Sequence, residues 1–194
     1  MKRLARHVPF ALLLAGCAII PRGTGPQELF WERLQALCGR AFPGRVVSND
    51  PGDRQLAAAR LVLHVARCEP ATVRIAFHAS LDASRTWVIA RTAGGLSLTH
   101  IHRGEDGREE VRSGYGGETA APGSARRQEF PANARTRALF RREGIAEAGA
   151  NIWSLEIVPG RLLAYAIDRP GRHLRIEFDL GRPVRLPGPA WGER

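Results

Sequence analysis

The stretch 153-WSLEIVPGRLLAYAIDRPGRHLRIEFDL-180 decides the fold of this chain. Within it, apolar side chains recur at every second position in three runs, residues 153–157, 163–167 and 174–180. Alternation with a period of two is typical of a strand with one buried face and one solvent face. Pro159-Gly160 and Pro170-Gly171 lie between the runs and favour turns. The stretch therefore predicts a three-stranded antiparallel meander.

The same period of two extends upstream, through residues 61–66, 73–77, 85–92 and 96–102. Gly94-Gly95 is a hairpin signal between the last two runs, whereas residues 114–125 are predicted to be a long loop. Eight or nine strands with no β-α-β rhythm indicate an antiparallel, mainly β protein of the α+β class. Such a meander hides its edges by closing into a barrel or by folding into a sandwich.

Two helices are expected beside the sheet. Residues 27–37 carry an apolar stripe at helical spacing and predict an N-terminal helix. Asn133 can cap a short internal helix that carries Leu139 and Phe140 and ends near Gly144. A chain of 194 residues is long enough for one domain with its own core.

The N-terminus has the pattern of an export signal. Residues 1–7 are basic, residues 8–14 are apolar, and small residues follow. The apolar run is too short to span a membrane, which takes about 20 apolar residues. Leu14-Ala15-Gly16-Cys17 resembles the lipobox of bacterial lipoproteins. The alternative is an ordinary secreted protein that has a cysteine near its cleavage point.

The lipobox resemblance implies that the chain is cut before Cys17 and that this cysteine carries lipid. The expected segments are a signal peptide at residues 1–16, a tether at 17–26 and a single β-rich domain at 27–194. The lipid bilayer would then be a partner, with the domain at the periplasmic face of the cell envelope. Ala18, where an aspartate would indicate retention in the inner membrane, favours the outer membrane. Export also argues against nucleic acid as a partner.

The basic composition has two interpretations. The net charge is +10 and Lys2 is the only lysine, so the basic side chains of the mature chain are arginines. Because arginine binds phosphates and carboxylates bidentately, a structural envelope protein that contacts anionic polymer or lipid headgroups is one interpretation. An arginine-rich genome composition explains the same counts, and we favour it because acidic residues are interleaved with the basic ones.

Cys38 and Cys68 remain once Cys17 is assigned to lipid. Neither cysteine lies in a C-x-x-C motif or beside a histidine, which argues against a metal or catalytic thiol. An even number of cysteines in an oxidising compartment favours a disulfide. We therefore expect a bond between Cys38 and Cys68.

The densest polar segment lies at the end of the run 96–102 and in the turn after it. Leu96, Leu98, His100 and His102 share one face of the expected strand, so the histidines are drawn inward with the leucines. Buried imidazoles need hydrogen-bond partners. We expect a binding site for a small ligand or partner at this place, formed by Arg85, His100, His102, Arg103, Asp106 and Tyr115.

Two histidines on one strand can also be metal ligands. His100 and His102, with the carboxylate of Asp106 or Glu105, would form a zinc site and support a metal-dependent hydrolase. The alternative is that both histidines are hydrogen-bonded at the strand end and that no cofactor is bound. We favour this alternative, because an H-x-H pair without a third histidine at a typical spacing is not specific for a metal.

Other catalytic patterns are missing from the sequence. Ser84, Ser97 and Ser113 lie outside any G-x-S-x-G elbow. Trp87 and Trp153 are expected in the core rather than on a sugar-binding surface. The sequence therefore favours a binding protein over an enzyme.

The motifs SRTW (84–87), GLSLTHIHR (95–103), EDG (105–107), YGG (115–117), QEFP (128–131) and NIW (151–153) also carry a resemblance. Together they are similar to a family of uncharacterised secreted bacterial proteins. The resemblance covers Phe30 to Trp191 and implies export and a compact single domain. It implies no activity and no catalytic residues.

The lipid anchor gives the first testable prediction. Substitution Cys17→Ala or Cys17→Ser removes the thiol that would be acylated, so processing and lipidation are expected to stop. Metabolic labelling with a fatty acid, followed by isolation of the protein, should mark the wild type only. Equal labelling of the variant would show that Cys17 carries no lipid.

Overall fold

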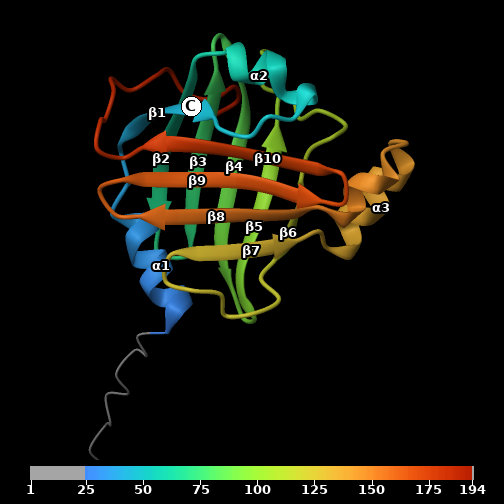
Figure 1. The fold of residues 1–194 in the computed structure, drawn as a ribbon, viewed down its shortest axis with the longest axis horizontal. Helices are drawn as coiled ribbons and strands as arrows, with labels where there is room; N and C mark the ends of the chain where they lie inside the picture. Colours follow the sequence, from blue (N-terminus) through green and yellow to red (C-terminus); the bar gives the residue numbers. More distant parts are fainter. Residues whose placement is uncertain (1–24, 194) are drawn as a thin grey trace, which may run out of the picture.

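A computed structural model describes residues 25–193 of the chain. The predicted signal peptide, Cys17 and the tether up to residue 24 lie outside the described residues, as does residue 194. Figure 1 shows strands that wrap around a common interior, with helices at the margins of the sheet. The prediction of a mainly β, antiparallel protein is confirmed.

The described part of the chain forms one antiparallel sheet of ten strands, one or two more than expected. The sheet follows chain order except that β1 also pairs with β10. The meander predicted over 153–180 is present as β8, β9 and β10. The strands are β1 (Ala41–Val46), β2 (Leu61–Glu69), β3 (Thr72–Ala79), β4 (Asp82–Thr92), β5 (Gly95–His102), β6 (Tyr115–Glu118), β7 (Arg127–Pro131), β8 (Ile152–Val158), β9 (Leu162–Arg169) and β10 (Arg172–Asp179).

The sheet closes into a nearly complete barrel. Its two outer strands, β6 and β7, meet through an isolated bridge between Gly117 and Ala132. A Cβ atom at Gly117 would lie 2.0 Å from the carbonyl oxygen of Pro131, so only glycine allows this approach. The hydroxyl group of Thr136 completes the seam, with 2.7 Å hydrogen bonds to the amide and the carbonyl oxygen of Gly116. Of the two expected architectures, the barrel is the one observed.

Both expected helices are present. Helix α1 (Pro26–Gln35) buries Phe30 and Leu34, and helix α3 (Ala134–Arg142) is capped by the side chain of Asn133 as predicted. Elements not expected from the sequence are the short helix α2 (Arg54–Ala58), the 3-10 turns 51–53 and 146–150, and strand β6 within the predicted loop 114–125. Over residues 25–193, no helix has the length and apolar character needed to cross a membrane.

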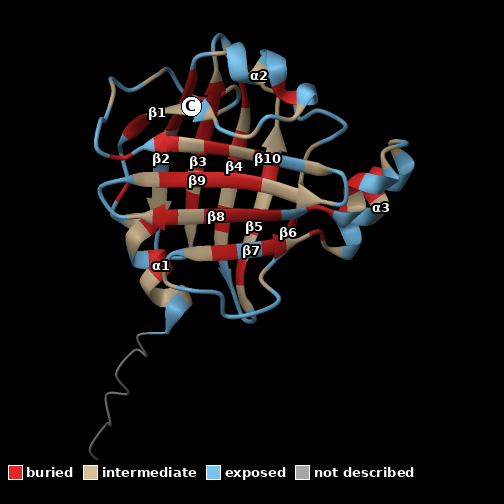
Figure 2. Ribbon diagram, in the orientation of Figure 1, coloured by how far each residue is buried: buried red, intermediate tan, exposed pale blue. Residues whose placement is uncertain are grey.

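The core fills the inside of the barrel. Inward-facing positions of the strands are buried, as the red bands of Figure 2 show, and in β5 the buried residues alternate with partly exposed ones. Large rings occupy much of this interior, and they stack on or lie edge-on to one another. They include Phe42, Phe77, Trp87, Phe130, Trp153, Tyr165 and Phe178.

The outside of strands β2 to β4 is covered by the last segment of the described chain, residues 181–193, which we name the C-terminal strap. Val184 forms a bridge to Ala41, and the amide of Trp191 donates a 2.9 Å hydrogen bond to the carbonyl oxygen of Ala83. Glu193 forms an ion pair with Arg74 of β3. The strap therefore shields outward-facing residues such as Ala76 that would otherwise contact water.

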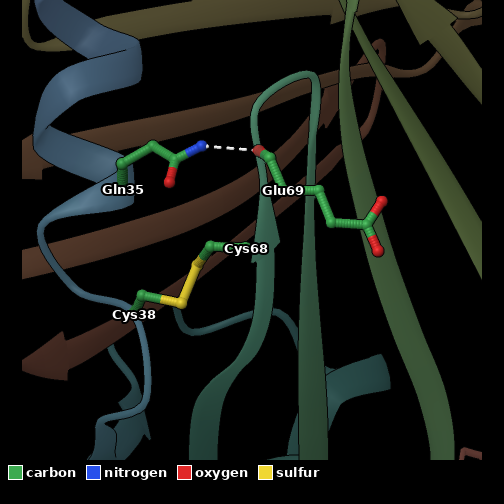
Figure 3. The surroundings of a disulfide bond; sticks show 4 residues. All are labelled: Gln35, Cys38, Cys68 and Glu69. Carbon is green, nitrogen blue, oxygen red and sulfur yellow. Dashed lines mark hydrogen bonds between the residues drawn. A yellow bond between two sulfur atoms is a disulfide. The ribbon is translucent and has the colours of Figure 1, made fainter.

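The disulfide predicted from the sequence joins Cys38 and Cys68, whose Cα atoms are 6.1 Å apart. It ties the turn after α1 to the end of β2, as Figure 3 shows. The side-chain amide of Gln35 donates a 2.8 Å hydrogen bond to the carbonyl oxygen of Glu69 beside it. Two contacts thus fasten α1 to the barrel at one place.

Loss of this disulfide is expected to destabilise the barrel. The bond spans 30 positions of sequence, and closing a loop of that length stabilises a protein by about 3–4 kcal/mol in the loop-entropy model. The double variant Cys38→Ser/Cys68→Ser should lose about that free energy of unfolding, measured with urea. A loss no larger than that of Gln35→Ala, which removes only the neighbouring hydrogen bond, would contradict the prediction.

Candidate functional site

The structure divides the six residues expected to form a site into two groups. Arg85, His100, His102 and Tyr115 come together at and within one end of the barrel, from β4, β5 and β6. Arg103 and Asp106 are not part of this cluster. We describe the four clustered residues first, from the interior outward.

His100 is the innermost residue of the cluster and is 2% exposed. It lies on the inner face of β5 with Leu96 and Leu98, as the alternation predicted. Its Nε2 atom lies 2.9 Å from the hydroxyl oxygen of Tyr165 on β9, with which it shares a hydrogen bond. The ring of Tyr165 stacks on Trp87 at a centroid distance of 4.2 Å. The bond to Tyr165 links opposite sides of the barrel.

His102 forms a second pair nearer to solvent. Its Nε2 atom lies 3.0 Å from the hydroxyl oxygen of Tyr115, with which it shares a hydrogen bond. The ring of Tyr115 also stacks on the ring of His100, at 4.8 Å between centroids. The two histidine–tyrosine pairs are therefore in contact with each other.

Burial controls the ionisation of these pairs. It lowers the pKa of His100 to about 3, with a further contribution from His102. It lowers the pKa of His102 to about 4, helped by the positive charge of Arg85, and raises the pKa of Tyr115 to about 12. The backbone of Tyr115 acts in the opposite direction and raises the pKa of His100 slightly. Even so, the Nδ1 atom of His100 has no hydrogen-bond partner among the described residues. At neutral pH both pairs are uncharged.

Arg85 and Asp82 form the mouth of the cluster. Their side chains are ion-paired and about one-third exposed. Asp82 also accepts a 2.9 Å hydrogen bond from the amide of Ser84, and its pKa is lowered by Ser84 and Arg85 against the effect of burial. We name Asp82, Arg85, His102 and Tyr115 the rim.

Arg103 and Asp106 lie in the turn that follows β5, outside the barrel. Arg103 donates hydrogen bonds to the carbonyl oxygen of Gly107 at 3.0 Å and to Glu109 at 2.9 Å. Asp106 accepts a 3.0 Å hydrogen bond from the amide of Arg108. Strand alternation explains the position of Arg103, because the residue after His102 points to the opposite face, whereas Asp106 lies in the turn beyond the strand. Both side chains make hydrogen bonds within the turn, so the structure does not bring them together with the other four residues.

The positions of His100, His102 and Asp106 also test whether these residues could form a zinc site. In residues 25–193, no three His, Cys, Asp or Glu side chains are placed to hold a metal ion together. His100 and His102 each use one ring nitrogen on a tyrosine, while Asp106 caps its own turn. The set of His100, His102 and Asp106, or Glu105 in its place, is therefore not assembled as ligands.

Sequence reasoning missed two residues of the cluster, Tyr165 and Asp82. Tyr165 was recognised only as an inward residue of the meander, and alternation does not show which residue faces it across a barrel. Asp82 lies three positions before Arg85 at the start of β4, and two opposite charges at this spacing could have indicated the ion pair. No family model, curated protein or solved structure matches the chain.

The chain has two tyrosines, and they allow a matched test of the cluster. Tyr165→Phe leaves a buried ring nitrogen of His100 without a partner, which is expected to cost about 1–3 kcal/mol of unfolding free energy. Tyr115→Phe removes the corresponding hydroxyl group near solvent, where water can replace it, and should cost less. Urea denaturation of both variants measures the difference. A larger loss for Tyr115→Phe would contradict the assignment of Tyr165 as the inner partner.

Proposed function

We propose that the protein is a lipid-anchored binding domain of the bacterial cell envelope, in which the barrel is a rigid support and the rim contacts a partner. The export signal and the lipobox-like Leu14-Ala15-Gly16-Cys17 motivate the anchor. The Cys38–Cys68 bond is in keeping with an oxidising compartment. The rim supports the binding role.

The filled interior argues against a ligand held inside the barrel. Stacked and edge-on rings occupy the space where a hollow barrel would hold a small molecule. His100 and Tyr165 are also sealed from solvent by these rings. Binding at this end of the molecule therefore has to use the rim.

The rim has hydrogen-bonding capacity to spare. Arg85 carries five N–H donors and uses one nitrogen on Asp82. His102 bonds to Tyr115 through Nε2, and within residues 25–193 its Nδ1 atom makes no hydrogen bond. The free donors suit a polar contact with a partner.

Apolar side chains flank the rim, and this observation carries the proposal of a protein partner. Leu81 is 95% exposed in the turn between β3 and β4, and Val111 is 76% exposed in the connection from β5 to β6. Antiparallel pairing puts both connections at the same end of the sheet as Arg85 and His102. Exposed apolar groups around a polar centre are a feature of protein-binding surfaces.

Photo-crosslinking in intact cells tests this proposal. A photoreactive phenylalanine derivative placed at position 81 or 111 should give a discrete adduct. The same group at position 93, in the turn of the β4–β5 hairpin at the opposite end, should not. Arg85→Gln is expected to lower the adduct yield at position 81 at least fivefold without loss of folded protein. Equal adducts from position 93, or a yield unaffected by Arg85→Gln, would refute a partner at the rim.

A further inference from the structure

A second place on the molecule has the form of a ligand site. A cavity of about 350 Å³ lies between the outward face of β2–β4 and the C-terminal strap. It is separate from the rim, because the residues of β2, β3 and β4 that line it alternate with those that face the barrel interior. Pockets for small molecules start at roughly 300 Å³, so this cavity suits a small ligand.

The wall of the cavity is mainly apolar and is already formed. Ala66 and Ala76 contribute from the strands, and the strap contributes Leu186, Pro187, Pro189 and Ala190. The two prolines restrict the backbone of the strap. The strap is also held on both sides of the cavity, through Val184 and through Trp191. A hydrocarbon group could therefore enter without extensive rearrangement of the fold.

One buried polar atom in this wall has no partner. The Nδ1 atom of His64 is buried and makes no hydrogen bond within residues 25–193. Burial lowers the pKa of His64, so the imidazole is neutral and can carry a proton on Nδ1. A buried donor without an acceptor costs about 1–3 kcal/mol. Because Nδ1 is inaccessible to solvent, the contribution of His64 to the cavity is its uncharged ring surface.

The charges at the cavity favour an anion. Arg67 is exposed and lines the cavity, and its guanidinium group has no ion pair or hydrogen bond within the described chain. Arg74 also lines it, but its charge is balanced by Glu193 of the strap, with one contact of 3.0 Å. The cavity thus has one uncompensated positive charge beside an apolar wall.

We propose that this cavity binds a small monocarboxylic acid with a hydrocarbon body. The carboxylate pairs with the guanidinium group of Arg67, and the neutral ring of His64 adds no competing charge to the wall. The hydrocarbon body packs against Ala76 and the prolines of the strap. This binding is independent of the lipid anchor and of any partner at the rim.

The test uses 3-phenylpropionate as the probe and the full chain in lipid nanodiscs. Equilibrium dialysis, with empty nanodiscs as the blank, should show one equivalent bound at saturation. The neutral analogue 3-phenylpropionamide should bind at least tenfold more weakly, because it cannot pair with Arg67. Equal affinity for the acid and the amide, or no saturable binding of the acid, would overturn the proposal.

Variants locate the binding. Arg67→Ala is expected to weaken binding of 3-phenylpropionate at least tenfold, and Arg67 is exposed, so the fold should be retained. Ala66→Trp should abolish binding by filling the cavity. Arg141→Ala removes an exposed arginine of α3 that lies outside the cavity and should leave the affinity unchanged. Equal weakening by Arg141→Ala and Arg67→Ala would show attraction to net charge rather than a site.

Discussion

The hydrogen bond between His100 and Tyr165 is the interaction around which the rest of the barrel is arranged. It joins β5 to β9 across the interior, and these strands belong to opposite halves of the sheet. Trp87 stacks on one partner of this bond and Tyr115 on the other. A buried imidazole or hydroxyl group without a partner costs free energy of folding. The native pairing of the strands is therefore favoured, because it places His100 of β5 opposite Tyr165 of β9. The surrounding rings then fill the space between the halves.

Because the interior is packed with side chains, a ligand or partner can contact only the outer surfaces of the molecule. A barrel filled with side chains has no room for a ligand in its centre, so contacts have to occur at the rim or outside the sheet. The rim combines the partly exposed Arg85 with the outer histidine–tyrosine pair. The C-terminal strap forms a separate cavity over β2–β4. The rim is formed by β4, β5 and β6 and the cavity by β2, β3 and β4, so the two proposed sites can be tested separately.

Local sequence pattern predicts much of this architecture. The alternation in 153–180 corresponds to β8–β10, the glycines after Ala93 to the β4–β5 hairpin, and Asn133 to the cap of α3. Features that depend on contacts distant in sequence were not predicted. Strand β6 contains Gly116 and Gly117, which have low strand propensity, and it forms because the barrel closes there. Likewise, alternation placed His100 inside but could not identify Tyr165 as its partner.

The state of His100 tests the central claim most directly. In the full chain labelled with ¹⁵N-histidine, its ring resonances can be assigned by their loss in His100→Gln. An imidazole sealed in the core and bonded to Tyr165 has a pKa of about 3 and should stay neutral at pH 5. Titration of His100 near pH 6.5, the ordinary value for an exposed histidine, would contradict a closed barrel built around this bond.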